Sequence, residues 1–92
     1  MIQSFKCKDT QALFETGRSR RFQTIELVAT RKLAQLAAAT TLEFLRSPPG
    51  NQLERLAGDR KGQYSIRINR QWRVCFVWTD QGPANVEIVD YH

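Results

Sequence analysis

Long apolar runs are missing from this chain of 92 residues. A membrane-spanning helix needs about 18 or more consecutive apolar residues, and no segment approaches that length. The first residues, Met1 to Lys6, also lack the apolar stretch of a secretory signal peptide. These absences exclude a membrane span and argue against export. We therefore predict a single domain over residues 1–92 in the cytoplasm, with no membrane partner.

Cysteine and histidine are scarce. The two cysteines, Cys7 and Cys75, form no C-x-x-C pair, and the single histidine is His92. Without metal-ligand spacing or a cluster of Asp, Glu and His, the sequence predicts neither a metal site nor a cofactor. A disulfide is not expected in the cytosol, so we interpret both cysteines as small apolar side chains.

Positive charge is present in excess and is concentrated in one segment. The formal net charge is +5. Residues 55–73 hold six cations against one acid, whereas residues 74–92 hold three acids and neither Lys nor Arg. A basic domain attracts polyanions, and nucleic acid is the first class of partner that this distribution indicates.

Helical patterns occupy the first half of the chain. Residues 10–16 predict a short helix that begins at Asp9 or Thr10 and stops at Gly17. Residues 23–39 predict a longer amphipathic helix, whose buried stripe comprises Ile25, Val28, Ala29, Leu33, Leu36 and Ala37. Residues 40–50 break the pattern, so we expect one irregular turn before the prolines.

Alternation of apolar and polar residues predicts strands at both ends of the chain. The expected strands cover residues 2–7, 53–58, 64–68, 72–78 and 86–91. The element order is then β-α-α-β-β-β-β. It predicts an α+β fold in which two N-terminal helices pack on one face of a mainly antiparallel, about five-stranded sheet.

The connection after residue 68 sets the register of the sheet. A three-residue loop pairs Ile66 with Val74 and Arg67 with Arg73, whereas a two-residue loop would pair Ile66 with Arg73. The first register is favoured because a one-residue slip exchanges the two faces of a strand. It places Arg67 and Arg73 side by side on the face away from the helices, where an anion would relieve their repulsion. Alternatively, both are solvated residues that pair with Glu87.

The last strand ends in Asp90-Tyr91-His92. If Val86 and Ile88 face the core, alternation puts Tyr91 on the face of the two arginines. The carboxylates of Asp90 and of the chain terminus favour the charged form of the His92 imidazole. A histidine at a chain end is otherwise read as part of a frayed terminus.

Six short motifs in order carry a resemblance over essentially the whole chain. They are Met1-Ile2-Gln3-Ser4-Phe5, Leu13-Phe14-Glu15 with Gly17, Leu56-x-Gly58-Asp59-Arg60-x-Gly62, Ser65-Ile66, Trp72-Arg73-Val74-x-Phe76 and the terminal Asp90-Tyr91-His92. Their order and spacing resemble HigB-type toxins, the plasmid-maintenance killer group of the RelE/ParE superfamily. That resemblance implies a RelE-like fold, mRNA cleavage in the A site of the 30S ribosomal subunit, and a helix-turn-helix antitoxin (HigA-like) as partner.

The resemblance also implies which residues act. Arg73, Asp90, Tyr91 and His92 correspond to the family's catalytic positions, and Arg67 lies out of strict register in a supporting position. The chain departs from the family where a histidine precedes the Gly-Asp-Arg turn, since Glu54 stands there. Either Glu54 takes part of the acid–base work, or activity is reduced, or the mechanism relies on His92.

The expected reaction is metal-free attack by the RNA 2′-OH, which yields a cyclic phosphate. Contacts to ribosomal phosphates are expected from a wider set of cations: Arg18, Arg20, Arg21, Arg46, Arg55, Arg60, Lys61 and Arg70. Two alternatives share the same features. One is a ParE-like inhibitor of DNA gyrase, and the other is a nucleic-acid-binding module without catalysis.

Overall fold

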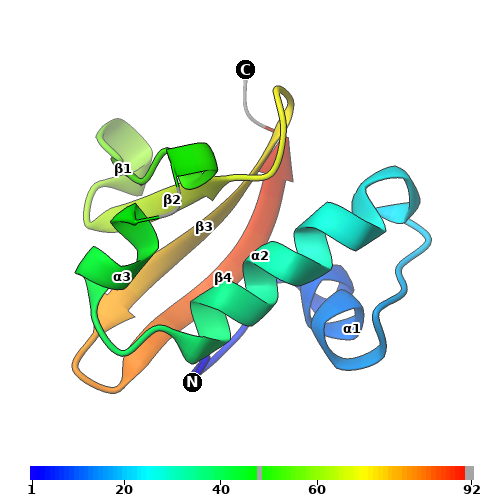
Figure 1. Cartoon of the computed structure of the whole chain (residues 1–92), viewed down its shortest axis with the longest axis horizontal. Helices are drawn as coiled ribbons and strands as arrows, with labels where there is room; N and C mark the ends of the chain where they lie inside the picture. The colour runs from blue at the N-terminus through cyan, green and yellow to red at the C-terminus, as the bar shows by residue number, and fades with distance from the viewer. Residues whose placement is uncertain (48, 91–92) are drawn as a thin grey trace.

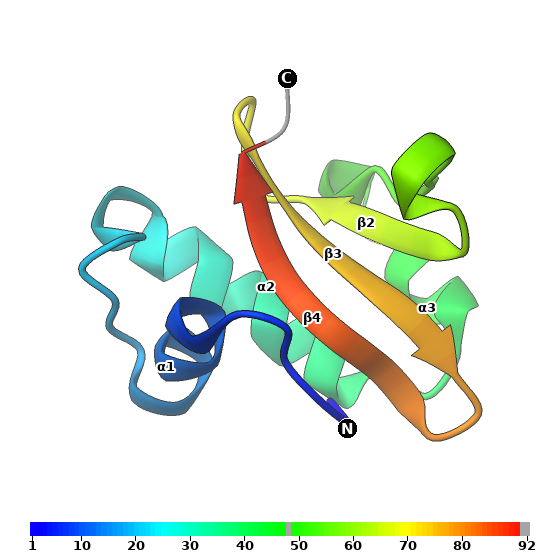
Figure 2. The same cartoon turned by 180° about the vertical axis from the view of Figure 1, so that it is seen from behind.

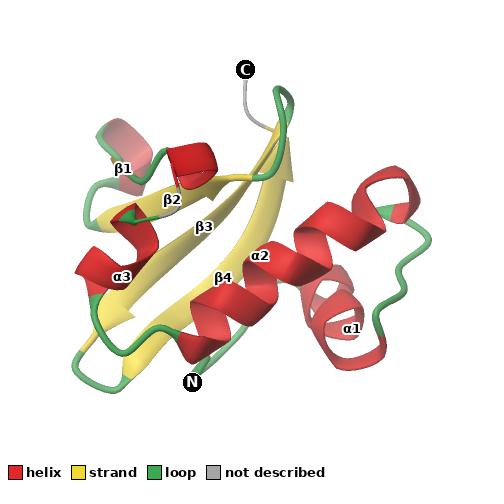
Figure 3. Ribbon diagram, in the orientation of Figure 1, coloured by secondary structure: helices red, strands yellow, loops and turns green. Residues whose placement is uncertain are grey.

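Three α-helices and a four-stranded sheet make up the part of the chain that the computed structural model describes, residues 1–47 and 49–90 (Figure 1). In chain order the elements are α1 (Lys8–Thr16), α2 (Glu26–Ala38), α3 (Leu42–Arg46), β1 (Glu54–Arg55), β2 (Gln63–Arg67), β3 (Trp72–Thr79) and β4 (Gly82–Asp90). Short 3₁₀ turns cover Gln23–Ile25, Pro49–Asn51 and Gly58–Arg60. Figure 3 shows α2 and α3 in front of the sheet and α1 to its side, beyond β4.

Helix α1 ends where the sequence predicts but begins earlier. Gly17 adopts the left-handed conformation at φ 76°, and its N–H donates to the Leu13 carbonyl at 2.8 Å. The predicted start at Asp9 or Thr10 is wrong, because the Cys7 carbonyl already accepts from the Gln11 N–H. Thr10 does not cap the helix. Its buried hydroxyl accepts from the Ile88 N–H at 3.0 Å and so ties α1 to β4.

Helix α2 begins after a 3₁₀ turn and buries most of the predicted stripe. Ile25, Ala29, Leu33 and Leu36 are all buried, which confirms that this face packs into the core. Val28 and Ala37 are the exceptions: Val28 is 38% exposed, and Ala37 is only partly buried.

The segment after α2 forms a helix rather than the irregular turn that we expected. The Thr41 hydroxyl accepts from the Phe44 N–H at 3.2 Å and caps the start of α3. Leu45 is fully buried and anchors this short helix against the core. A side-chain cap and one buried leucine therefore suffice for a single helical turn here.

The sheet has the order β1-β2-β3-β4 with every neighbouring pair antiparallel. Ile66 pairs with Val74 and Arg67 with Arg73, which confirms the predicted register. Strand β1 is shorter than the expected strand over residues 53–58. The tight link between β3 and β4 leaves two residues outside the strands, and Thr79 pairs with Gly82 across it.

The N-terminal residues do not form the fifth strand. They run parallel to β4 through a single bridge between Phe5 and Val86 (Figure 2). The Lys6 N–H donates to the Val86 carbonyl at 3.0 Å, and the Val86 N–H donates to the Ser4 carbonyl at 3.1 Å. Nearby, Asn85 is left-handed at φ 52°, and a bulge shifts the register between β3 and β4. The described sheet therefore has four strands and a docked N-terminal segment.

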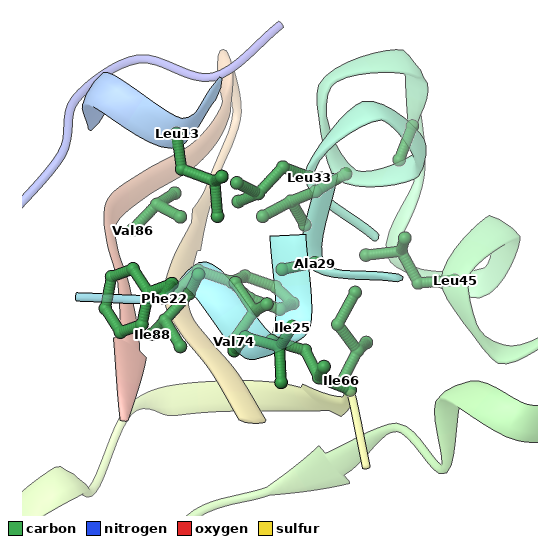
Figure 4. Packing of buried hydrophobic residues seen from close by; sticks show 14 residues of the cluster. Leu13, Phe22, Ile25, Ala29, Leu33, Leu45, Ile66, Val74, Val86 and Ile88 are labelled. Carbon is green, nitrogen blue, oxygen red and sulfur yellow. The ribbon is translucent and has the colours of Figure 1, made fainter. Parts of the chain in front are cut away.

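The core lies between the helices and one face of the sheet (Figure 4). Ile66, Val74 and Ile88 come from three neighbouring strands and meet Leu33 of α2 and Leu13 of α1. The partly buried aromatic residues Tyr64, Trp72 and Trp78 pack against this cluster. The other face of β2 to β4 carries Arg67, Arg73 and Glu87. None of the helices within the described ranges has the length and apolar character needed to cross a membrane.

Candidate active site

Arg73 is the most confined cation of the sheet. The residue is 5% exposed, and its Nε donates to the Ser65 hydroxyl at 2.7 Å across the β2–β3 pair. Its Nη2 donates to the carbonyl oxygens of Gln52 and Ser65. The structure thus corrects the expectation that this guanidinium stands openly on the sheet face. It is held in one orientation by acceptors on two segments.

Glu54 lies beside Arg73. Strand β1 pairs Glu54 with Ser65, and Ser65 in turn accepts from Arg73. Arg73 Nη1 lies 3.9 Å from Glu54 Oε1. The arginine side chain is 6% exposed and the glutamate side chain 48% exposed. A buried guanidinium and a solvent-accessible carboxylate therefore lie side by side at the β1 edge of the sheet, although they are 19 residues apart in sequence.

Arg67 faces the same side as Arg73 but has different surroundings. It is half-buried at the end of β2. The pKa of Lys32 is lowered, first by burial and second by the positive charge of Arg67. Lys32 of α2 therefore adds a third cation to this end of the molecule. Sequence analysis missed it, because Lys32 lies off the apolar stripe of its helix and resembles any solvated lysine.

The alternative in which Glu87 pairs with these arginines is wrong. Glu87 Oε1 accepts from Arg60 Nη1 at 2.7 Å and lies 3.9 Å from Lys6 Nζ. Glu87 therefore balances cations from the Gly58–Arg60 turn and the N-terminal segment. The carboxylate beside Arg73 is instead Glu54, from the shortest strand.

Asp90 does not share the face of Arg73. Asp90 pairs with Trp72, whereas Arg73 pairs with Val89, so alternation directs Asp90 and Arg73 to opposite faces. Asp90 accepts from Gln71 Nε2 at 3.0 Å at the end of β4. The predictions for Tyr91 and His92 lie outside the described residues. The structure thus brings Glu54, Arg67 and Arg73 together but does not place Asp90 with them.

The cations predicted to bind ribosomal phosphates differ in availability. The Arg60 side chain is 33% exposed, and its guanidinium donates to Glu87 and Gln63. Arg21 lies 3.5 Å from Asp9 and covers the Phe22 ring, and Arg46 lies 3.4 Å from Glu43. The exposed members of the set are Arg18, Arg20, Arg21, Arg46, Arg55, Lys61 and Arg70.

The two cysteines have different surroundings. Cys75 is fully buried between Ser65 and Glu87, and burial is the main cause that raises the pKa of its thiol. Cys7 is half-buried next to Arg21. Both are free thiols, and among residues 1–47 and 49–90 no three His, Cys, Asp or Glu side chains gather at one point.

This arrangement of helices and sheet matches solved structures of small bacterial toxins. The YoeB–YefM complex from Staphylococcus aureus gives a TM-score of 0.63 at 17% identity, over all of this chain and 98% of that one. The YoeB dimer from the same organism gives 0.56 at 18% identity, over 99% and 97% of the two chains. Both likenesses show that this chain has the fold of the YoeB chains.

Sequence comparison narrows the class to one family. Residues 3–92 match the family model described as the RelE-like toxin HigB of type II toxin–antitoxin systems, and the chain belongs to this HigB-like toxin family. It is 42% identical over 94 residues to Toxin HigB-1 of Vibrio cholerae, covering 100% of this chain and 98% of that one. It is 32% identical over 94 residues to Endoribonuclease HigB of Proteus vulgaris, with both chains covered completely. An antitoxin is therefore its expected partner class.

Proposed function

We propose that this protein is a ribosome-dependent endoribonuclease that cleaves mRNA in the 30S A site and so stops growth. A HigA-like helix-turn-helix antitoxin would neutralise it in the cytoplasm. The observation that carries the proposal is the pair formed by the confined Arg73 guanidinium and the accessible Glu54 carboxylate. The name of the Proteus vulgaris relative, an endoribonuclease, supports the same reaction.

The chemistry needs no metal in this proposal. The RNA 2′-oxygen bonds to the adjacent phosphorus while the bond from phosphorus to the 5′-oxygen breaks. The products are a 2′,3′-cyclic phosphate and a 5′-hydroxyl. One protein group must accept the 2′-OH proton, another must supply a proton to the leaving oxygen, and a cation must stabilise the charged phosphate.

Each role has a candidate. Arg73 supplies planar, charge-assisted donors to the phosphate, with Arg67 beside it on β2. We assign the 2′-OH proton to Glu54, whose carboxylate is accessible beside Arg73. His92 supplies the proton to the 5′-oxygen, because an imidazole titrates near neutral pH. Tyr91 stacks on a base, and Asp90 orients His92.

The deciding experiment maps mRNA ends by primer extension after induction of the toxin. We expect new ends inside translated frames for the natural chain. Replacing Glu54→Gln or His92→Gln should lower cleavage by about 10²-fold or more, because each removes a proton-transfer group. Glu43→Gln is the matched control, since Glu43 is an exposed carboxylate paired only locally with Arg46. Undiminished cleavage by both site variants would refute the assigned roles.

The nucleophile is tested with purified ribosomes programmed with a defined mRNA. A single 2′-deoxy nucleotide at the cleaved position should abolish the break, whereas the same substitution one codon away should leave it. A break that persists at the deoxy position would exclude attack by the 2′-OH. If replication stops before translation and mRNA stays whole, the gyrase alternative is correct instead.

A further inference from the structure

Asn51 is a buried polar residue with no place in the proposed chemistry. It is fully buried at the end of the Pro49–Asn51 turn. Its Nδ2 donates to Gln35 Oε1 at 3.0 Å and to the Leu45 carbonyl at 3.1 Å, and its Oδ1 accepts from Lys32 Nζ. A lysine can only donate and a carbonyl can only accept, so these partners permit a single orientation of the amide. Asn51 therefore fastens this segment to α2 and α3.

The residue after Asn51 has an unusual backbone. Gln52 is left-handed at φ 43°, a conformation that is costly for a residue with a Cβ atom. Its carbonyl oxygen accepts from Arg73 Nη2. Two residues later, Glu54 enters β1 beside the same guanidinium. The short stretch from Asn51 to Glu54 thus delivers two of the groups that surround Arg73.

These contacts form one connected path from helix α2 to the candidate site. Lys32 and Gln35 hold the Asn51 amide, the amide holds the start of the strained turn, and the turn presents its carbonyl to Arg73. Strain of this kind persists only where the surroundings over-determine it, and Asn51 supplies that restraint from inside the core. Ser65 holds the same guanidinium from the β2 side, through Arg73 Nε.

We propose that Asn51 is a positioning residue, which acts through the left-handed turn at Gln52 to hold Arg73 and Glu54 in the geometry needed for phosphate cleavage. The catalytic consequence rests on the proposed function. The positioning itself does not, because it concerns the orientation of Arg73 in the free protein. The competing interpretation is that Asn51 stabilises the fold without any selective effect on the site.

The first test observes Arg73 directly and needs no RNA. Hydrogen exchange at Arg73 Nε, measured by NMR, should be slow in the natural chain, because this N–H is buried against Ser65. Asn51→Ala should speed that exchange by about tenfold or more as the turn relaxes. Thr10→Val is the control for stability, since it removes a buried hydrogen bond between α1 and β4 without touching Arg73.

Selective acceleration in Asn51→Ala, but not in Thr10→Val, supports the proposal. Equal acceleration in both variants, or none in either, overturns it. If Asn51→Ala does not fold, Asn51→Asp replaces it. The aspartate keeps the shape and the Lys32 partner but loses the donor to the Leu45 carbonyl. The same selective result is then required.

The second test uses cleavage on programmed ribosomes. Asn51→Ala should lower kcat by about 10- to 100-fold with KM nearly unchanged, because misplacement of a catalytic group affects the chemical step. In the background Arg73→Lys, which lacks the fork that meets Gln52 and Ser65, Asn51→Ala should cause a clearly smaller further loss, because only its effect on Glu54 remains. If the losses in kcat from Asn51→Ala and Arg73→Lys simply multiply, Asn51 acts independently of Arg73 and its role is only structural. A natural chain that cleaves no RNA would refute the proposed function, and the exchange result would still decide the role of Asn51.

Discussion

Arg73 and Arg67 occupy paired positions on neighbouring strands yet have different surroundings. Arg73 is enclosed by Ser65, the Gln52 carbonyl and Glu54. Hydrogen bonds to a charged group contribute roughly 1.5–3 kcal/mol, and a buried guanidinium without them would be strongly destabilising. Arg67 is more exposed and lies near a second cation, Lys32. We therefore expect Arg73 to provide a fixed geometry and Arg67 to provide attraction for phosphate.

The thiols provide a prediction at the scale of single residues. Cys75 is fully buried and its pKa is raised by burial, so little reactive thiolate forms at neutral pH. A mild alkylating reagent should therefore modify Cys7 well before Cys75 in the folded protein. In urea the two thiols should react at similar rates. Mass spectrometry of the digested protein gives both rates, and rapid native labelling of Cys75 would contradict the burial seen here.

Strand β4 depends on segments that are distant in sequence. The N-terminal residues line one side of it, and β3 lines the other. Gly82 begins β4 at φ 126°, and a Cβ atom there would lie 2.5 Å from the carbonyl oxygen of Met1. Gly17 is also left-handed, but its Cβ would meet no atom within 4 Å. Gly82 is thus required both for its backbone conformation and for the close approach of Met1, whereas Gly17 is required for its backbone conformation alone.

This difference predicts how alanine substitutions at the two glycines change the stability of the protein. Gly17→Ala should lower the free energy of unfolding by about 1 kcal/mol, the cost of a left-handed alanine. Gly82→Ala should lower the free energy of unfolding by roughly 2 kcal/mol or more. The cost of the backbone strain at residue 82 is added to the cost of displacing the N-terminal segment. Urea unfolding followed by circular dichroism measures both. Faster amide exchange at Lys6, which donates to Val86, should accompany only Gly82→Ala, and equal losses would count against the close approach.

At the scale of the whole molecule, the helices cover one face of the sheet, and the candidate site lies at the β1 edge and on the other face. The net charge of +5 then acts as a long-range attraction for a polyanion such as ribosomal RNA. The exposed cations Arg55, Lys61 and Arg70 lie in the same basic stretch of sequence as Arg73. The residues expected to attract RNA and those proposed to cleave it therefore lie in overlapping parts of the chain.

Binding to ribosomes should weaken steeply as salt is raised. Lys61→Gln or Arg70→Gln should each reduce the slope of log affinity against log salt by about 0.7–0.9, the effect of one phosphate contact. Arg60→Gln should change this slope less and stability more, because Glu87 already engages Arg60. Sedimentation of toxin with ribosomes at several salt concentrations provides the slopes. Affinity that is independent of salt would exclude phosphate contacts as the source of binding.

The sequence by itself determined the fold class, the helix stop at Gly17 and the register that pairs Arg67 with Arg73. These features follow from local periodicity, turn chemistry and the cost of exchanging strand faces. Motif order also indicated the family. Glu54 was identified by its departure from the family pattern rather than by any local property.

Only the tertiary structure decided what surrounds each charge. Contacts between residues far apart in sequence pair Glu87 with Arg60 and hold Arg73 against Ser65 and Gln52. The positive charge of Arg67 also lowers the pKa of Lys32, after the larger effect of burial. The same applies to the N-terminal segment, which flanks β4 without completing a fifth strand. Periodicity sets the face of a side chain, but burial and partners depend on which segments meet across that face. The sequence alone therefore predicted Arg73 as an exposed residue on the sheet, whereas the tertiary structure shows it buried and held in place at the candidate site.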